Sequence, residues 1–307
     1  MKTEIKTLLV PVDFTEKSNN AVTMAVHMAG RHEARIILFH HFSNYYIIDR
    51  TGKQAVGTDT VQENFALAEK GLREMKHSAE KQNPLLKVDS VIGNSTMIDS
   101  LNECIVSENV DLVVAGTSGK QRIREFFLGS ASYEILTGAH CSVLLVPENC
   151  HTYDFEKILV PVRVTEHLHD KMVLSQTIAR KNNAKISLLG VCKEEDADRI
   201  KAAYDALWET LSKGIIEYST SFLLTKDKAL QISRFSKIDH ADIIILNYHD
   251  ENNWKSLFSE NFFKQVINLT DIPLFFMKDT AGIKNTIAGE NKVNNNAGFD
   301  ITLPNPG

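Results

Sequence analysis

The chain has 307 residues, of which 43% are hydrophobic and 24% charged, and its formal net charge is −5 at pH 7. This length and composition predict a globular chain with room for two domains. The acidic balance and the scattered lysines and arginines argue against nucleic acid as a partner, and the lack of a long apolar run argues against a membrane.

The N-terminus and the cysteines indicate the compartment. The first residues run directly into a strand-like segment, without the apolar stretch that is typical of an export signal. The four cysteines lack the spacing of a metal-binding pair and lie mostly in apolar segments. We therefore expect buried thiols in the reducing environment of the cytoplasm.

Apolar strand-like segments alternate with amphipathic segments through the first half of the chain. We expect strands near residues 5–12, 34–41, 86–92, 111–116 and 142–147, and helices near 16–32, 60–82, 96–108 and 129–138. Gly30 is expected to end the first helix. Because right-handed crossovers between such elements build a parallel sheet covered on both faces, the order predicts a doubly wound five-stranded α/β domain. Ligands bind such domains at the carboxyl ends of the strands, where the strand order reverses.

The chain also repeats itself. Lys6–Asp13 (KTLLVPVD) is matched by Glu156–Arg163 (EKILVPVR) at an offset of 150 residues, and Val110–Val114 by Ala241–Ile245 at an offset of 131. Since the offset falls from 150 to 131, the second half is 19 residues shorter. The fold class predicted is α/β, with two tandem doubly wound five-stranded parallel-sheet domains of Rossmann-like type.

The repeat also suggests domain boundaries. We expect a first domain over residues 1–150, a second over 151–280, and a tail over 281–307. The tail is polar and contains little apolar area to bury, so we expect it to be flexible.

Three glycines follow the fourth expected strand. Gly116, Gly119 and Gly129, the last followed by Ser130, have the spacing G-x2-G-x9-G-S. Backbone N–H groups without a neighbouring Cβ, next to a helix start, favour a bound phosphate chain, so the pattern predicts a nucleotide site. The same glycines could instead serve tight turns and close helix packing. Asp13, at the end of the first strand, could bind the ligand, cap the following helix, or do both.

Two adjacent histidines end the second expected strand. Because neighbouring residues of a strand point to opposite faces, we expect His40 and His41 to be separated, one packed and one lining a pocket. This separation argues against a shared metal site.

Several of these motifs together resemble one known family. The segments Leu9–Thr15 (LVPVDFT) and Cys141–Pro147 (CSVLLVP), the histidine pair and the spaced glycines are similar to those of the universal stress protein family. The resemblance covers nearly all of residues 1–280 as two copies. It implies an ATP site, with Mg²⁺ accompanying the nucleotide.

The resemblance also implies the residues of that site. Asp13 would contact the adenosine, and His41 would line the adenine pocket where the family more often has a small apolar residue. The full set implied is Pro11, Val12, Asp13, His41, Ala115, Gly116, Ser118, Gly119, Arg122, Gly129, Ser130, Ala131 and Ser132. Ser132 and its neighbours would present backbone and hydroxyl donors to the phosphates. Arg122 could reach the phosphates, or it could belong to a solvated loop.

The second half has lost this pattern. Arg163 replaces Asp13, and Asn247, Asp250, Glu260 and Asn261 replace Gly116, Gly119, Gly129 and Ser130. Carboxylates at these positions would repel phosphate, so we predict one nucleotide site per chain, in the first half. Arg163 is expected at the surface or at a domain contact. In the family, separate copies pair through their last strands, which implies an internal pseudo-dimer joined through residues 143–146 and 274–277. The sequence leaves undecided whether two tandem chains also form a homodimer.

The sequence favours binding over catalysis. No nucleophile, base and orienting group occur together in a recognisable pattern. The leading hypothesis is an ATP-binding stress-response protein that acts through nucleotide-dependent regulation. The alternatives are a protein-interaction module with a vestigial pocket and a weak ATPase.

Overall fold

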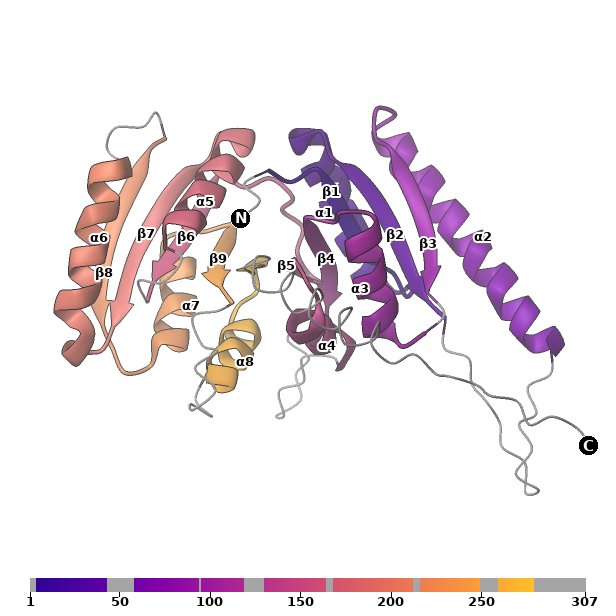
Figure 1. The fold of residues 1–307 in the computed structure, drawn as a ribbon. Coiled ribbons are helices and arrows are strands. Elements are labelled where there is room, and N and C mark those ends of the chain that lie inside the picture. The colour runs from indigo at the N-terminus through magenta and orange to yellow at the C-terminus, as the bar shows by residue number, and fades with distance from the viewer. Residues whose placement is uncertain are drawn as a thin grey trace, which may run out of the picture.

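A computed structural model describes residues 4–42, 58–93, 95–118, 130–163, 168–211, 216–248 and 259–278 (Figure 1). The first half contains β1 (Thr7–Pro11), α1 (Glu16–His32), β2 (Arg35–His41), α2 (Thr58–Gln82), β3 (Val88–Gly93), α3 (Met97–Ser107), β4 (Leu112–Thr117), α4 (Ser130–Gly138) and β5 (Ser142–Pro147). The second half contains β6 (Lys157–Val162), α5 (Leu168–Asn182), β7 (Lys185–Cys192), the short 3-10 helix η1 (Glu194–Asp196), α6 (Ala197–Leu211), β8 (Tyr218–Leu224), α7 (Lys228–Ile238), β9 (Ile243–Asn247), α8 (Ser259–Leu269) and β10 (Leu274–Met277).

All these strands belong to one ten-stranded sheet with the order β3-β2-β1-β4-β5-β10-β9-β6-β7-β8. Each half is parallel, and the strand order reverses between β1 and β4 and again between β6 and β9. The predicted fold class, two tandem doubly wound α/β units, is confirmed. The reversal points mark where each half could bind a ligand.

The two halves join through β5 and β10, which run antiparallel. Phe275 pairs with Leu144 and Phe276 with Val143, within the segments that the sequence placed at the contact. Because side chains alternate along a strand, Leu144 and Phe275 enter one hydrophobic core while Val143 and Phe276 enter another. The first core lies under α1, α2, α5 and α6 and the second under α3, α4, α7 and α8, so each core continues across both halves.

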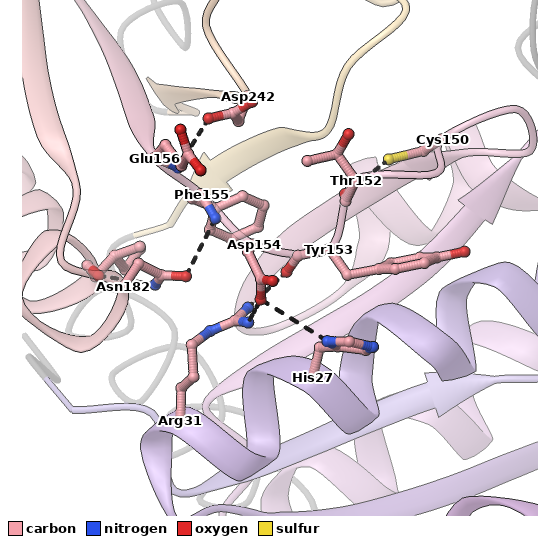
Figure 2. Close-up of polar contacts among 11 residues, drawn as sticks. His27, Arg31, Cys150, Thr152, Tyr153, Asp154, Phe155, Glu156, Asn182 and Asp242 are labelled. Atoms are coloured by element: carbon pink, nitrogen blue, oxygen red, sulfur yellow. Dashed lines mark hydrogen bonds and ion pairs between the residues drawn. The ribbon is translucent and has the colours of Figure 1, made fainter. Parts of the chain in front are cut away.

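The segment that connects the halves, residues 148–156, is held against α1. The Asn20 side-chain amide donates to the carbonyl oxygens of Pro147 (2.8 Å) and Cys150 (3.0 Å). Further along α1, Arg31 and His27 point toward Asp154 (Figure 2). These contacts tie the start of the second half to the first helix of the chain.

Two details of α1 and α2 differ from the simplest expectation. Gly30 does not end α1, which continues to His32 and is capped by Glu33 in the left-handed conformation (φ 54°). A Cβ on Gly30 would lie 3.0 Å from the side-chain nitrogen of Asn83, so this glycine allows a close approach of the segment after α2. The 25 residues of α2 against the 15 of α6 account for much of the difference in length between the halves.

The expectation that the cysteines are buried thiols is confirmed, since all four are buried and none forms a disulfide. In the part of the chain that the structure describes, no helix combines the length and apolar character needed to span a bilayer.

Candidate functional site

A cavity of about 180 Å³ lies at the carboxyl ends of β1, β2 and β4, at the reversal point of the first half. It is lined by Pro11, Val12, Asp13, Lys17, Ser18, Phe39, His40, His41, Met97, Ala115, Gly116, Ala131, Ser132 and Ile135. The first turns of α1, α3 and α4 all contribute to this lining. Pockets that enclose a drug-sized ligand measure about 300–1,000 Å³, so the cavity matches part of a nucleotide.

Most of the predicted site residues meet at this cavity. Pro11, Val12, Asp13, His41, Ala115, Gly116, Ala131 and Ser132 line it, whereas Ser118, which follows β4, does not. Gly119, Arg122, Gly129 and the side chain of Ser130 lie outside the described residues. Sequence reasoning missed Lys17, Ser18, Phe39, His40, Met97 and Ile135. Lys17 and Ser18 could have been found, because they follow Asp13 by about one helical turn.

Asp13 is an ionised and oriented carboxylate. Its Oδ1 accepts hydrogen bonds from the backbone N–H of Thr15 (3.1 Å) and from the Thr15 hydroxyl, and its Oδ2 lies 3.0 Å from Nζ of Lys17. Burial raises the pKa of Asp13, but hydrogen bonds from Thr15, Lys17 and Ser18 outweigh burial and lower the pKa to about 2. Asp13 therefore orders the turn before α1 and also lines the cavity. The N-cap position of α1 is Thr15 and not Asp13, and the binding of a ligand by Asp13 stays a prediction.

Gly116 serves helix packing as well as the cavity. A Cβ at this position would lie 2.2 Å from the backbone oxygen of Lys17, so only glycine lets the first turn of α1 rest on the end of β4. The Ser132 hydroxyl donates to the Gly116 carbonyl oxygen (2.9 Å) and fixes the start of α4 to the same strand. In this arrangement the Ser132 hydroxyl hydrogen is directed to Gly116, and its donation to a phosphate stays a prediction.

The two histidines both line the cavity, which corrects the prediction that the sheet separates them. His40 Nδ1 lies 2.8 Å from the Val12 carbonyl oxygen, and His41 Nε2 lies 2.8 Å from the Ser95 carbonyl oxygen. Since a carbonyl oxygen only accepts, His40 Nδ1 and His41 Nε2 each carry a hydrogen. Both residues still pair within the β2–β3 ladder, and the two imidazoles reach different loops, so the correction concerns the lining of the cavity and not a contact between the rings.

In the second half, side chains of that half fill the position that corresponds to the cavity. Arg163, which replaces Asp13, is buried, and its guanidinium carbon lies 3.8 Å from the centroid of the Phe262 ring. Phe262 stands where the first half has Ala131. The expectation that Arg163 lies at the surface or at a domain contact is therefore wrong, because the guanidinium packs on an aromatic ring of its own half. Asp250 and the side chains of Glu260 and Asn261 lie outside the described residues.

Comparison with known proteins agrees with this geometry. The model of the universal stress protein family matches residues 4–147. A universal stress protein of Thermus aquaticus is 26% identical over 141 residues, which are 46% of this chain and 98% of that protein. The N-terminal half of the chain therefore matches the universal stress protein family. A second universal stress protein, from Methanocaldococcus jannaschii, is 23% identical over 143 residues, covering 46% of this chain and 81% of that protein.

A solved structure extends the comparison of folds to both halves of this chain. The crystal structure of a universal stress protein from Archaeoglobus fulgidus superimposes with a TM-score of 0.70, covering 89% of this chain and 98% of that chain at 16% identity. At this identity the similarity concerns the fold. It covers the tandem arrangement as well as the single unit.

The electrostatics of this cavity suit an anionic ligand. Helix N-termini carry partial positive charge and unpaired N–H groups, and α1 and α4 both begin at the cavity. Over the described ranges, histidines, cysteines and carboxylates do not gather in groups of three or more that could hold a metal ion.

Proposed function

We propose that the N-terminal half of this chain binds ATP, and that the bound nucleotide regulates its contacts with partners in a stress response. The observation that carries the proposal is the convergence of Asp13 with the starts of α1 and α4 on one cavity at the strand reversal. A carboxylate that is ionised at neutral pH accepts hydrogen bonds from sugar hydroxyls. The N–H groups at the start of α4 are suited to phosphate oxygens.

The magnesium ion in this proposal comes with the nucleotide. Mg²⁺ in nucleotide sites is commonly held by phosphates with one or two carboxylates and several waters. Among the lining residues that the structure describes, Asp13 alone is acidic. This described part of the lining fits an ion that the phosphates themselves hold better than a separate protein-built metal centre.

The proposal assigns the nucleotide to the first half alone. In the second half, Phe262 and the buried Arg163 occupy the positions of Ala131 and Asp13. We propose domains over residues 1–150 and 151–280, with the second acting as a structural partner in an internal pseudo-dimer through β5 and β10. The predicted flexible tail, residues 281–307, lies outside the described residues. A cytoplasmic location is part of the same proposal.

Ala131→Phe tests the site, because it places in the first half the side chain that the second half already has. Ala131 is exposed at the cavity, so the variant is expected to fold. ATP at about one hundred times its Kd should stabilise the wild-type protein by about 2.7 kcal/mol in thermal unfolding, and Ala131→Phe should abolish this shift. The control Ala66→Phe, at an exposed position on α2, should keep it.

Direct calorimetry with ATP, ADP and AMP completes the test. If the wild-type protein binds none of the three, the nucleotide proposal fails, and a protein-interaction module with a vestigial pocket becomes the better description. The small volume of the cavity, about 180 Å³, is the observation that favours this second candidate.

A further inference from the structure

Lys17 supplies a positive charge at the candidate site. It belongs to the first turn of α1, lines the cavity, and keeps 29% of its side chain exposed. Among the lining residues that the structure describes, Lys17 is the single lysine or arginine, and Asp13 the single carboxylate. The two are paired at 3.0 Å, so these two charges neutralise each other.

The backbone of Lys17 is fixed while its ammonium group can move. Its carbonyl oxygen lies against the Gly116 position, at 2.2 Å from where a Cβ would be, so the first turn of α1 is held on the end of β4. Nζ ends a flexible four-carbon chain and has three donors that can be redirected. The backbone of Lys17 is therefore anchored at the end of β4, while its ammonium group can change position over the cavity.

A ligand that uses Asp13 meets this ion pair. A sugar hydroxyl that donates to Asp13 Oδ2 shares that oxygen with Nζ of Lys17 and weakens the ion pair. Leaving an ammonium group beside the ligand without an anionic partner costs free energy, which a neutral nucleoside cannot recover. A phosphate attached to the same sugar supplies a new partner.

We infer that Lys17 exchanges the Asp13 carboxylate for the sugar-linked phosphate of the ligand, and so selects nucleotides over nucleosides. This inference rests on the proposed function and adds a specificity-determining residue to it. Asp13 then binds the sugar, while Lys17 binds the phosphate of those ligands that carry one.

The experiment compares the affinities of adenosine, AMP and ATP for the wild-type protein, Lys17→Met and Lys17→Arg by calorimetry at low ionic strength. Lys17→Met should weaken AMP and ATP about tenfold, the loss expected for one hydrogen bond to a charged group, and should leave adenosine unchanged or tighter. Lys17→Arg keeps the charge and should retain the preference for AMP over adenosine. Lys70→Met, at an exposed lysine of α2 paired with Glu74, should match the wild-type protein.

The results of these titrations distinguish a failure of the role of Lys17 from a failure of nucleotide binding. If Lys17→Met lowers all three affinities by the same factor, or changes none of them, the role of Lys17 is overturned while nucleotide binding stands. If the wild-type protein binds neither AMP nor ATP, the proposed function and this inference fail together.

Discussion

Arg31 of α1 forms an ion pair with Asp154 of the connecting segment, and its Nη2 also donates to the carbonyl oxygen of Tyr153 at 2.7 Å (Figure 2). The two partners differ in exposure, since 17% of the Arg31 side chain is exposed against 73% for Asp154. We therefore expect Arg31→Met to cost about 1–2 kcal/mol of unfolding free energy, because it removes a charge-assisted bond to a backbone carbonyl.

Asp154→Asn provides the matched comparison in urea denaturation. It removes an exposed ion pair and keeps the bond to Tyr153, so it should cost less than about 1 kcal/mol. Equal losses for the two variants would show that the ion pair dominates and that the backbone contact does not.

Asn20 is expected to be the most sensitive polar residue of the connection between the halves. It is buried, donates to the carbonyl oxygens of Pro147 and Cys150, and accepts from the Tyr153 hydroxyl at 2.6 Å. Asn20→Leu should lower the unfolding free energy by about 2–3 kcal/mol, because it removes the Asn20 donor from the Cys150 carbonyl and the acceptor from the Tyr153 hydroxyl, while Pro147 keeps the N–H of Cys150. Tyr153→Phe removes one of these bonds and should cost about 1 kcal/mol; a larger loss than for Asn20→Leu would contradict this ranking.

Gly116→Ala tests whether the glycine is needed for packing. The added Cβ would meet the backbone of Lys17, which cannot move without shifting α1, so we expect a loss of about 2–3 kcal/mol or more in chemical denaturation. Gly138→Ala is the control, because its Cβ would meet only the flexible side chain of Ile98 at 3.0 Å. Similar stability for both variants would argue that the strand end has room.

His32 makes the protein sensitive to mild acid. Burial lowers the pKa of His32 to about 4, with help from the nearby cations Arg31, Lys181 and Lys6. Between the ordinary pKa of 6.5 and about 4, the folded state binds fewer protons than the unfolded chain, so stability present above pH 6.5 is lost as the pH falls. The loss should approach about 3 kcal/mol.

His32→Leu should flatten this part of the pH profile, measured as unfolding free energy at a series of pH values. His77→Leu, at an exposed position on α2, should leave the profile as in the wild-type protein. An unchanged slope in His32→Leu would assign the acid sensitivity to other groups.

The order of strands and helices could be predicted from the sequence because periodicity and repeats are local signals. The strand predicted near residues 142–147 was found at Ser142–Pro147, and the helix predicted near 16–32 at Glu16–His32. The place of the cavity followed from topology, since the ends of β1 and β4 meet wherever a doubly wound sheet reverses.

The chemistry of individual side chains was harder to predict because it depends on neighbours distant in the sequence. Gly116 is required by the backbone of Lys17, and the Ser132 hydroxyl is taken by Gly116 itself. Arg163 was expected at the surface or at a domain contact, but it is buried and packs against the Phe262 ring, about one hundred residues later. Such contacts appear only once the fold brings the segments together.

The antiparallel ladder of β5 and β10 joins two parts of a single polypeptide. Its formation is therefore unimolecular, and dilution does not separate the halves as it would separate two free subunits. The covalent connection also fixes the ratio of the two kinds of half at one to one. The half with the open cavity always faces the half in which Arg163 packs against Phe262. Identical free subunits would pair like with like and could not maintain this asymmetry.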